Sequence, residues 1–268
     1  MQLEIQEIIS TLKSSLGTRD DVDPIEALAD QARETAEGAG VRSWRLRAFR
    51  LGVDEIWYSD LGAIDGKLQL LERDRYRIEI NSKSPSTRQL FSLAHEIGHI
   101  LLEKHVPILG SDLKHRSLFH SDYSLAEEAV VDRLAAAMLI PFDVVTEMLQ
   151  QSQSALQTTI DLQTKYGVSV AAILHRMSDI GATTPPIFQF RCNRTLGELI
   201  LLTGPRWKLP LALSPPPDWR IPMSRVSVDP SRRDLQLGTI RVCHDVGLEE
   251  DLKGEFIWKN PFRMMASF

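Results

Sequence analysis

This sequence of 268 residues is poor in cysteine, has no long apolar run and carries no excess of positive charge. Its two cysteines, Cys192 and Cys243, have no C-x-x-C spacing, which argues against a cysteine-based metal site and fits a reducing compartment. No stretch of about 18 uncharged apolar residues is present, and residues 1–5 lack the basic and apolar regions of a secretory signal. We therefore expect a cytoplasmic protein without a membrane span.

The charge balance limits the classes of partner. The formal net charge is −5, with 25% charged and 43% hydrophobic residues, which is ordinary for a folded globular protein. A dedicated nucleic-acid binder has a basic footprint that this composition lacks. The length allows one large domain or two smaller ones, each with its own core.

The stretch over residues 91–102 reads FSLAHEIGHILL and carries two histidines four positions apart, with a glutamate between them. On a helix, residues i and i+4 lie on one face about 5–6 Å apart, so His95 and His99 can both reach one Zn²⁺ ion while Glu96 borders the same face. Three protein ligands leave a fourth position for water, whose proton Glu96 can take as general base. The motif predicts a zinc site and peptide hydrolysis.

The alternative is a core helix that carries two histidines by coincidence. The apolar positions around the motif predict a buried amphipathic helix, with Ser84 and Pro85 as its N-cap and first-turn proline. In such a helix, a glutamate without a metal-bound partner would be costly. The context therefore favours the metal site.

The third ligand must come from another segment. The polar stretch over residues 103–123 offers His105, His115, His120 and Tyr123. A better candidate lies in the helix predicted between this stretch and Pro141.

That helix, predicted over residues 124–140, offers a carboxylate. Glu128 and Asp132 are four positions apart and border the apolar stripe that buries the helix, whereas Glu127 is expected to face elsewhere. The spacing suits a metal-binding Glu128 and an Asp132 that accepts the remaining N–H of a ligand histidine and so fixes its tautomer. A charged solvent face is the alternative.

Upstream of the motif, the pattern predicts two helices and three strands. The helices are expected over residues 5–16 and 23–38, and the strands over 44–52, 67–71 and 76–81. The last strand can form the sheet edge beside the cleft, where an extended substrate would add by main-chain hydrogen bonds. A strand that merely completes the sheet is the alternative interpretation.

Residues 142–182 form a predicted helical segment with the cadence of a helix-turn-helix. It contains only Lys165 and Arg176 against four carboxylates, and its last helix has few groups suited to phosphates or bases. We expect this segment to pack against the protein rather than to bind DNA, and we expect His175 to lie outside any metal site.

The composition changes at residue 183, which predicts a boundary. Beyond it, short strands are expected over residues 187–192, 198–202, 239–243 and 254–258. The stretch 183–268 is therefore predicted to be a small β-rich domain. A sensor role and a structural or dimerising role are both open for it.

Two segments resemble the ImmA/IrrE family of zinc metallopeptidases. One is RQLFSLAHEIGHILL over residues 88–102, and the other is the helix that ends in AAAMLIP at Pro141. The third zinc ligand of that family is the glutamate 13 residues before this proline, which is Glu128 here. The resemblance implies an α+β fold with a zincin-like metallopeptidase domain over residues 1–141, a helix-turn-helix-like segment over 142–182 and a GAF-like sensor domain over 183–268.

The same resemblance implies the chemistry. His95, His99 and Glu128 would hold one zinc ion and Glu96 would activate water, as in gluzincin-type enzymes. Leu134 stands where the family often has phenylalanine, which is a conservative departure. The implied substrate is a helix-turn-helix transcriptional repressor, whose site-specific cleavage relieves repression of stress or DNA-damage response genes.

Several points stay open at this stage. Tyr123, His115 and His120 are all candidates to stabilise the oxyanion. The sequence does not identify the repressor, the activating signal, the metal used in the cell or the oligomeric state. A DNA-binding or sensor regulator with a non-proteolytic zincin domain is the alternative function, and the intact motif residues argue against it.

Overall fold

The computed structural model divides the chain into two compact units. The first comprises residues 1–146 and 162–180, and the second comprises residues 147–161 and 181–268. The residues that the structure describes are 4–34, 41–71, 75–106, 124–152, 154–181, 187–193, 198–203, 220–222, 226–227, 236–243, 249–260 and 263–267. Within these residues, no helix has the length and apolar character needed to cross a membrane.

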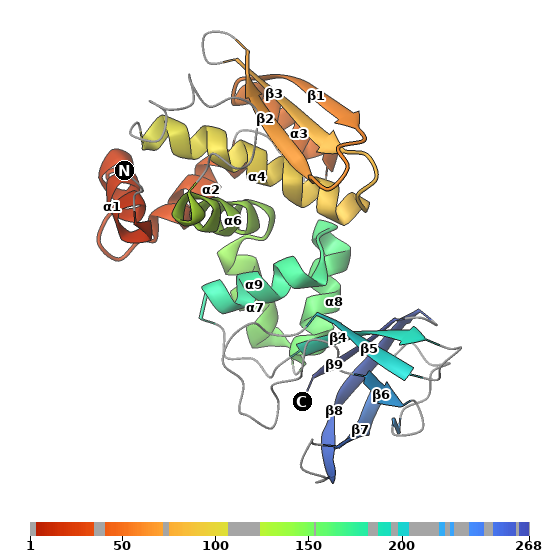
Figure 1. Cartoon of the computed structure of the whole chain (residues 1–268). Coiled ribbons are helices and arrows are strands. Elements are labelled where there is room, and N and C mark those ends of the chain that lie inside the picture. Colours follow the sequence, from red (N-terminus) through yellow and green to blue (C-terminus); the bar gives the residue numbers. More distant parts are fainter. Residues whose placement is uncertain are drawn as a thin grey trace. The chain divides into compact units, whose positions relative to one another are not determined.

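The first unit combines helices with a small mixed sheet, an α+β arrangement (Figure 1). Its elements are α1 (Ile5–Leu16), α2 (Pro24–Glu34), α3 (Val41–Arg50), β1 (Val53–Ser59), β2 (Gly66–Leu70), β3 (Tyr76–Asn81), α4 (Ser86–His105), α6 (Leu125–Leu139) and α9 (Val170–Asp179). Two further helices, α7 (Phe142–Gln151) and α8 (Ala155–Tyr166), each have residues assigned to both units.

The N-terminal helices form where the periodicity predicts them. Ile8 and Leu12 of α1, four positions apart, are both fully buried. The helix ends at Gly17, whose φ of 62° places it in the left-handed region that favours glycine. At the start of α2, the carboxylate of Asp23 accepts a hydrogen bond from the backbone N–H of Ile25 at 2.9 Å, as an N-cap does.

The segment predicted as a strand over residues 44–52 is instead the helix α3 followed by a turn, and this prediction is wrong. Arginines alternate with apolar residues there, but the buried apolar side chains are Trp44 and Ala48, which have the i, i+4 spacing of a helix. Leu46 and Phe49 are exposed. The strand β1 follows α3 and was not predicted.

The sheet has the strand order β1-β3-β2. β1 runs parallel to β3, and β2 runs antiparallel to it. Of the two interpretations of this strand, the sheet edge is therefore wrong and the strand that completes the sheet is correct, because β3 is the central strand. Alternation in β3 buries Tyr76, Ile78 and Ile80, which identifies the covered face of a strand but not its place in the sheet.

The helix α4 lies between the sheet and α6, with the strands on one side of it and α6 on the other (Figure 1). Gly98 allows the close approach of the two helices, since a Cβ atom there would lie 3.0 Å from Cγ1 of Val131 on α6. Pro85 is the N-cap residue of α4. The predicted N-cap, Ser84, is wrong: its hydroxyl donates to Asp65 at 2.7 Å instead.

The last helix of the first unit, α9, is pinned by a buried arginine. Arg176 has a side-chain exposure of 2%, and its guanidinium donates to the carbonyl of Ile140 at 2.9 Å and to Glu26 Oε2 of α2 at 2.7 Å. Arg176 is one of the two cations of the helix-turn-helix-like segment, and it is used here to pack α9 against the rest of the first unit. His175 is exposed.

The described strands of the second unit form a six-stranded antiparallel sheet in the order β6-β5-β4-β9-β8-β7. They are β4 (Ile187–Asn193), β5 (Glu198–Thr203), β6 (Arg220–Pro222), β7 (Gln236–Cys243), β8 (Glu249–Asn260) and β9 (Arg263–Ser267). The boundaries at residues 141 and 182 and the GAF-like character of this region stay predictions.

Candidate metal centre

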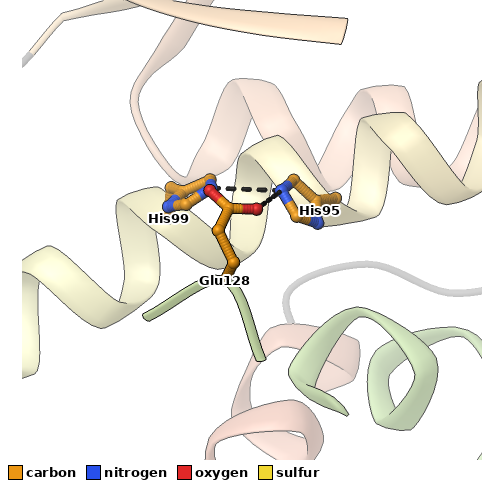
Figure 2. Close-up of side chains that lie close together, drawn as sticks. All are labelled: His95, His99 and Glu128. Carbon is orange, nitrogen blue, oxygen red and sulfur yellow. Dashed lines mark hydrogen bonds and ion pairs between the residues drawn. The ribbon is translucent and has the colours of Figure 1, made fainter. Parts of the chain in front are cut away.

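Helices α4 and α6 bring His95, His99 and Glu128 together (Figure 2). The Nε2 atoms of the two histidines are 3.1 Å apart. Glu128 rises from α6 between them, with Oε2 at 3.3 Å from His95 Nε2 and Oε1 at 3.5 Å from His99 Nε2. Two imidazole nitrogens and one carboxylate thus converge on one point.

These separations fit a small divalent metal ion. Ligand atoms about 2.0–2.1 Å from a tetrahedral zinc ion lie about 3.4 Å from one another. The three observed distances of 3.1, 3.3 and 3.5 Å are close to that value. The donor set of two imidazoles and one carboxylate is also the set that catalytic zinc sites use. The residues present therefore fit the metal that the motif predicts.

Asp132 contacts the first histidine. Its Oδ1 atom lies 3.0 Å from Nδ1 of His95, the ring nitrogen that does not face the other ligands. A carboxylate in this position keeps the proton on Nδ1 and leaves Nε2 available to a metal. Asp132 lies one turn after Glu128 on α6, as the spacing predicted, and its side chain is 61% exposed.

Glu127 faces the second histidine, and the expectation that it points elsewhere is wrong. Its Oε1 atom lies 3.6 Å from Nδ1 of His99, and both side chains are buried. The sequence contained a signal for this placement, because the buried stripe of α6 continues one helical turn back from Val131 to residue 127. A carboxylate at a stripe position is easily taken for the start of a solvent face.

Glu96 is buried beside the cluster, with 1% of its surface exposed. It approaches β2 so closely that a Cβ atom on Gly66 would lie 2.9 Å from Glu96 Oε1. No local pattern reveals this contact, because it joins the edge strand to α4 across the sheet–helix interface. Gly66 is therefore a site residue that sequence reasoning missed.

The carboxylates change the acid–base properties of the cluster. Burial alone would lower the pKa of His95, but hydrogen bonds to Asp132 and Glu128 and the charge of Glu96 outweigh it and raise that pKa to about 10. Burial would also lower the pKa of His99, but Glu127 and Glu128 outweigh it and raise that pKa. Burial would raise the pKa of Glu128, yet the two histidines hold it well below its ordinary value.

The remaining candidates are placed elsewhere or not described. His105 lies at the end of α4, where Nδ1 contacts the hydroxyl of Ser15 at 3.1 Å, so it is not part of the cluster. His115, His120 and Tyr123 lie outside the described residues.

Comparison with known proteins finds relatives of the segment that contains this cluster. Residues 50–178 match the family model of the IrrE N-terminal-like domain. The radiation response metalloprotease IrrE of Deinococcus deserti is 30% identical over 162 residues, which cover 58% of this chain and 53% of that protein. The protein of the same name from Deinococcus radiodurans is 30% identical over 145 residues, which cover 53% of this chain and 40% of that one.

The chain thus matches about half the length of these relatives. A match to a Mycobacterium tuberculosis transcriptional regulator of known structure covers 99% of this chain and 82% of that protein's chain. Its TM-score of 0.47 and sequence identity of 13% are too low to support any conclusion. The matched domain contains both histidines and Glu128. Residues 50–178 are accordingly an IrrE N-terminal-like domain, and the chain is a distant homologue of the IrrE radiation response metalloproteases.

Proposed function

We propose that this protein is a zinc-dependent endopeptidase with a zincin-like catalytic domain. The observation that carries the proposal is the convergence of His95, His99 and Glu128, with the buried Glu96 beside them, within a domain of the IrrE family. Buried carboxylates next to two histidines are costly unless a cation compensates them. A bound metal would supply that charge in place of the proton that His95 carries without it.

Each side chain then has a defined task. His95, His99 and Glu128 hold the metal, which when bound polarises a carbonyl group and acidifies water. Glu96 accepts the proton of the attacking water and passes it to the leaving amine. Asp132 keeps the His95 ring in the orientation that presents Nε2. Tyr123, His115 and His120 stay candidates for stabilising the oxyanion.

The edge strand β2 supports a peptide substrate. It lies at one end of the strand order and pairs with β3. An extended peptide that adds to this edge by main-chain hydrogen bonds would pass Gly66 and therefore Glu96. Recognition through the main chain suits an endopeptidase that acts on an exposed segment.

We further propose that the substrate is a helix-turn-helix transcriptional repressor, cleaved once to start a stress response such as the response to DNA damage. Family resemblance supports this part, together with the names of the two relatives, which place metalloproteases in a radiation response. The β-rich region over residues 183–268 is proposed to act as a GAF-like sensor that carries the activating signal.

The test compares wild type with Glu96→Gln on a purified candidate repressor in the presence of zinc. Wild type should give two discrete fragments, and chelator should stop the reaction until zinc is restored. Glu96→Gln should keep its zinc and its fold but cleave at least about 100-fold more slowly, because it lacks the general base. Equal rates for the two proteins would refute the mechanism.

A panel of repressors separates the two parts of the proposal. Cleavage of an unstructured peptide without cleavage of any repressor would refute the substrate assignment and leave the endopeptidase in place.

A further inference from the structure

We propose that Glu127 is a positioning residue for His99, so that each histidine of the metal centre has a carboxylate of its own on Nδ1. The inference deepens the proposed metal site and rests on it. We expect Glu127 to affect zinc affinity more than Asp132 does, because the carboxylate of Glu127 is buried, whereas that of Asp132, which contacts His95, is exposed to water.

The two ring nitrogens of His99 have different surroundings. Nε2 lies 3.5 Å from Glu128 Oε1 and 3.1 Å from His95 Nε2, at the point where the ligands converge. Nδ1, on the other side of the ring, lies 3.6 Å from Glu127 Oε1. This is ion-pair distance, slightly longer than a hydrogen bond. A proton held on Nδ1 leaves the lone pair of Nε2 for a metal.

Burial separates the two supporting carboxylates. The side chain of Glu127 is 4% exposed and that of His99 is 1% exposed, whereas Asp132 is 61% exposed. Water screens an exposed charge strongly, and a buried charge acts through a medium of lower dielectric constant. The Glu127 carboxylate should therefore hold His99 more strongly than Asp132 holds His95, despite its longer contact.

A purely structural role for Glu127 is the competing explanation. Ser124 is the N-cap residue of α6, and its hydroxyl accepts a hydrogen bond from the backbone N–H of Glu127 at 3.1 Å. The pattern Ser124-x-x-Glu127 is also that of a capping box, in which the glutamate would support the helix end. A capping role affects the stability of α6 with or without metal, whereas a positioning role affects the metal itself.

The experiment uses Glu127→Gln, with Asp132→Asn as the matched variant and Glu128→Gln as the ligand control. Glutamine keeps the size, the acceptor oxygen and the ability to complete a capping box, but it removes the charge. Zinc affinity is measured by competition with a chromogenic chelator, and thermal unfolding is measured by circular dichroism with and without zinc. None of these measurements needs a substrate.

We expect Glu127→Gln to lower zinc affinity by about 10- to 100-fold, and by more than Asp132→Asn does. The metal-free unfolding temperature should change little, while the increase produced by zinc should shrink. The absorption spectrum of the Co²⁺-substituted protein should also change between wild type and Glu127→Gln, because the orientation of a ligand ring is altered.

Three results would overturn the inference. They are an unchanged zinc affinity in Glu127→Gln, an effect smaller than that of Asp132→Asn, and equal losses of stability with and without zinc, which would indicate a capping role. Failure of the proposed function looks different, since a protein that binds zinc in a Glu127-dependent manner but cleaves nothing refutes the peptidase alone. A wild type that binds no zinc refutes both.

Discussion

At the scale of single residues, the two ring nitrogens of each imidazole in the metal centre have different partners. Nε2 of His95 and of His99 turns toward Glu128, while the two Nδ1 atoms turn toward Asp132 and Glu127. In the absence of metal, these four carboxylate contacts favour protonated histidines. Protons and metal ions therefore compete for the same two rings.

This competition predicts proton release on zinc binding. With a pKa of about 10, His95 is protonated at pH 7.5 in the metal-free protein and must lose that proton to bind zinc. Isothermal titration calorimetry in buffers of different ionisation enthalpy should show at least about one proton released per zinc ion. Binding without net proton release would mean that His95 is already neutral.

The same pKa gives the sign of the pH dependence of the metal-free fold. A histidine whose pKa is raised on folding contributes stability that is complete below its unfolded pKa of about 6.5. For His95 this contribution is lost as the pH rises toward about 10.

Gly66 provides a prediction about the catalytic base. Its φ is outside the left-handed region, so it is the space beside Glu96 that requires glycine. In Gly66→Ala, the new Cβ would lie 2.9 Å from Glu96 Oε1 and would displace the carboxylate. We expect full zinc content but a loss of cleavage rate of about tenfold to 100-fold, because a shift of about 1 Å misplaces the base.

The control for Gly66→Ala is Gln69→Ala, which changes a side chain on the same strand. It should cleave at the wild-type rate, measured as kcat/KM on the same peptide. Loss of zinc from Gly66→Ala would show that the substitution disturbs the whole site and not Glu96 alone.

Much of the site could be predicted from the sequence, because the i, i+4 rule is local. It placed His95 with His99 on one face of α4 and Glu128 with Asp132 on one face of α6. Glu127 was missed because a carboxylate on the buried stripe of α6 was taken for part of a solvent face. Gly66 was missed because its role depends on how β2 packs against α4, and spacing along one element contains no information about that packing.

At the scale of elements, the ion pair between Arg176 of α9 and Glu26 of α2 joins two helices that are far apart in the sequence. We expect Arg176→Met to lower the free energy of unfolding by about 3–5 kcal/mol, because it leaves a partly buried carboxylate without its partner. Urea unfolding measures the change. The double variant Glu26→Leu with Arg176→Met should recover part of the loss, since neither charge then remains.

Lys165→Met on α8 is the matched control, since this exposed cation should change stability by no more than about 0.5 kcal/mol. A change of that size in Arg176→Met as well would show that the buried pair contributes little.

The errors at this scale have a physical explanation. The stretch before β1 alternates in polarity like a strand, but Arg47 is buried with its guanidinium 4.6 Å from the ring of Trp44, so a polar residue faces the core. A rule that treats arginine as exposed cannot detect this. The position of β3 in the centre of the sheet depends on pairing with both neighbours, which periodicity does not report.

At the scale of the whole molecule, net charge and the buried arginine together argue against a DNA-binding role. The chain carries a net charge of −5, and one of the two cations of the helix-turn-helix-like segment, Arg176, is buried in an ion pair. We expect no salt-dependent mobility shift with duplex DNA at low salt, because too few phosphate contacts are available for counterion release. A sub-micromolar shift that Lys165→Ala abolishes would contradict this prediction.

The pairing of Glu26 with Arg176 also sets an order of events during synthesis, because its two partners are 150 positions apart. At about 5–20 residues per second, a ribosome adds Arg176 several seconds after Glu128. All residues of the metal centre therefore exist on the growing chain while α9 is still being made. During that interval Glu26 has no Arg176 to pair with, so the N-terminal helices can reach their full stability only after the last helix of their own unit has left the ribosome.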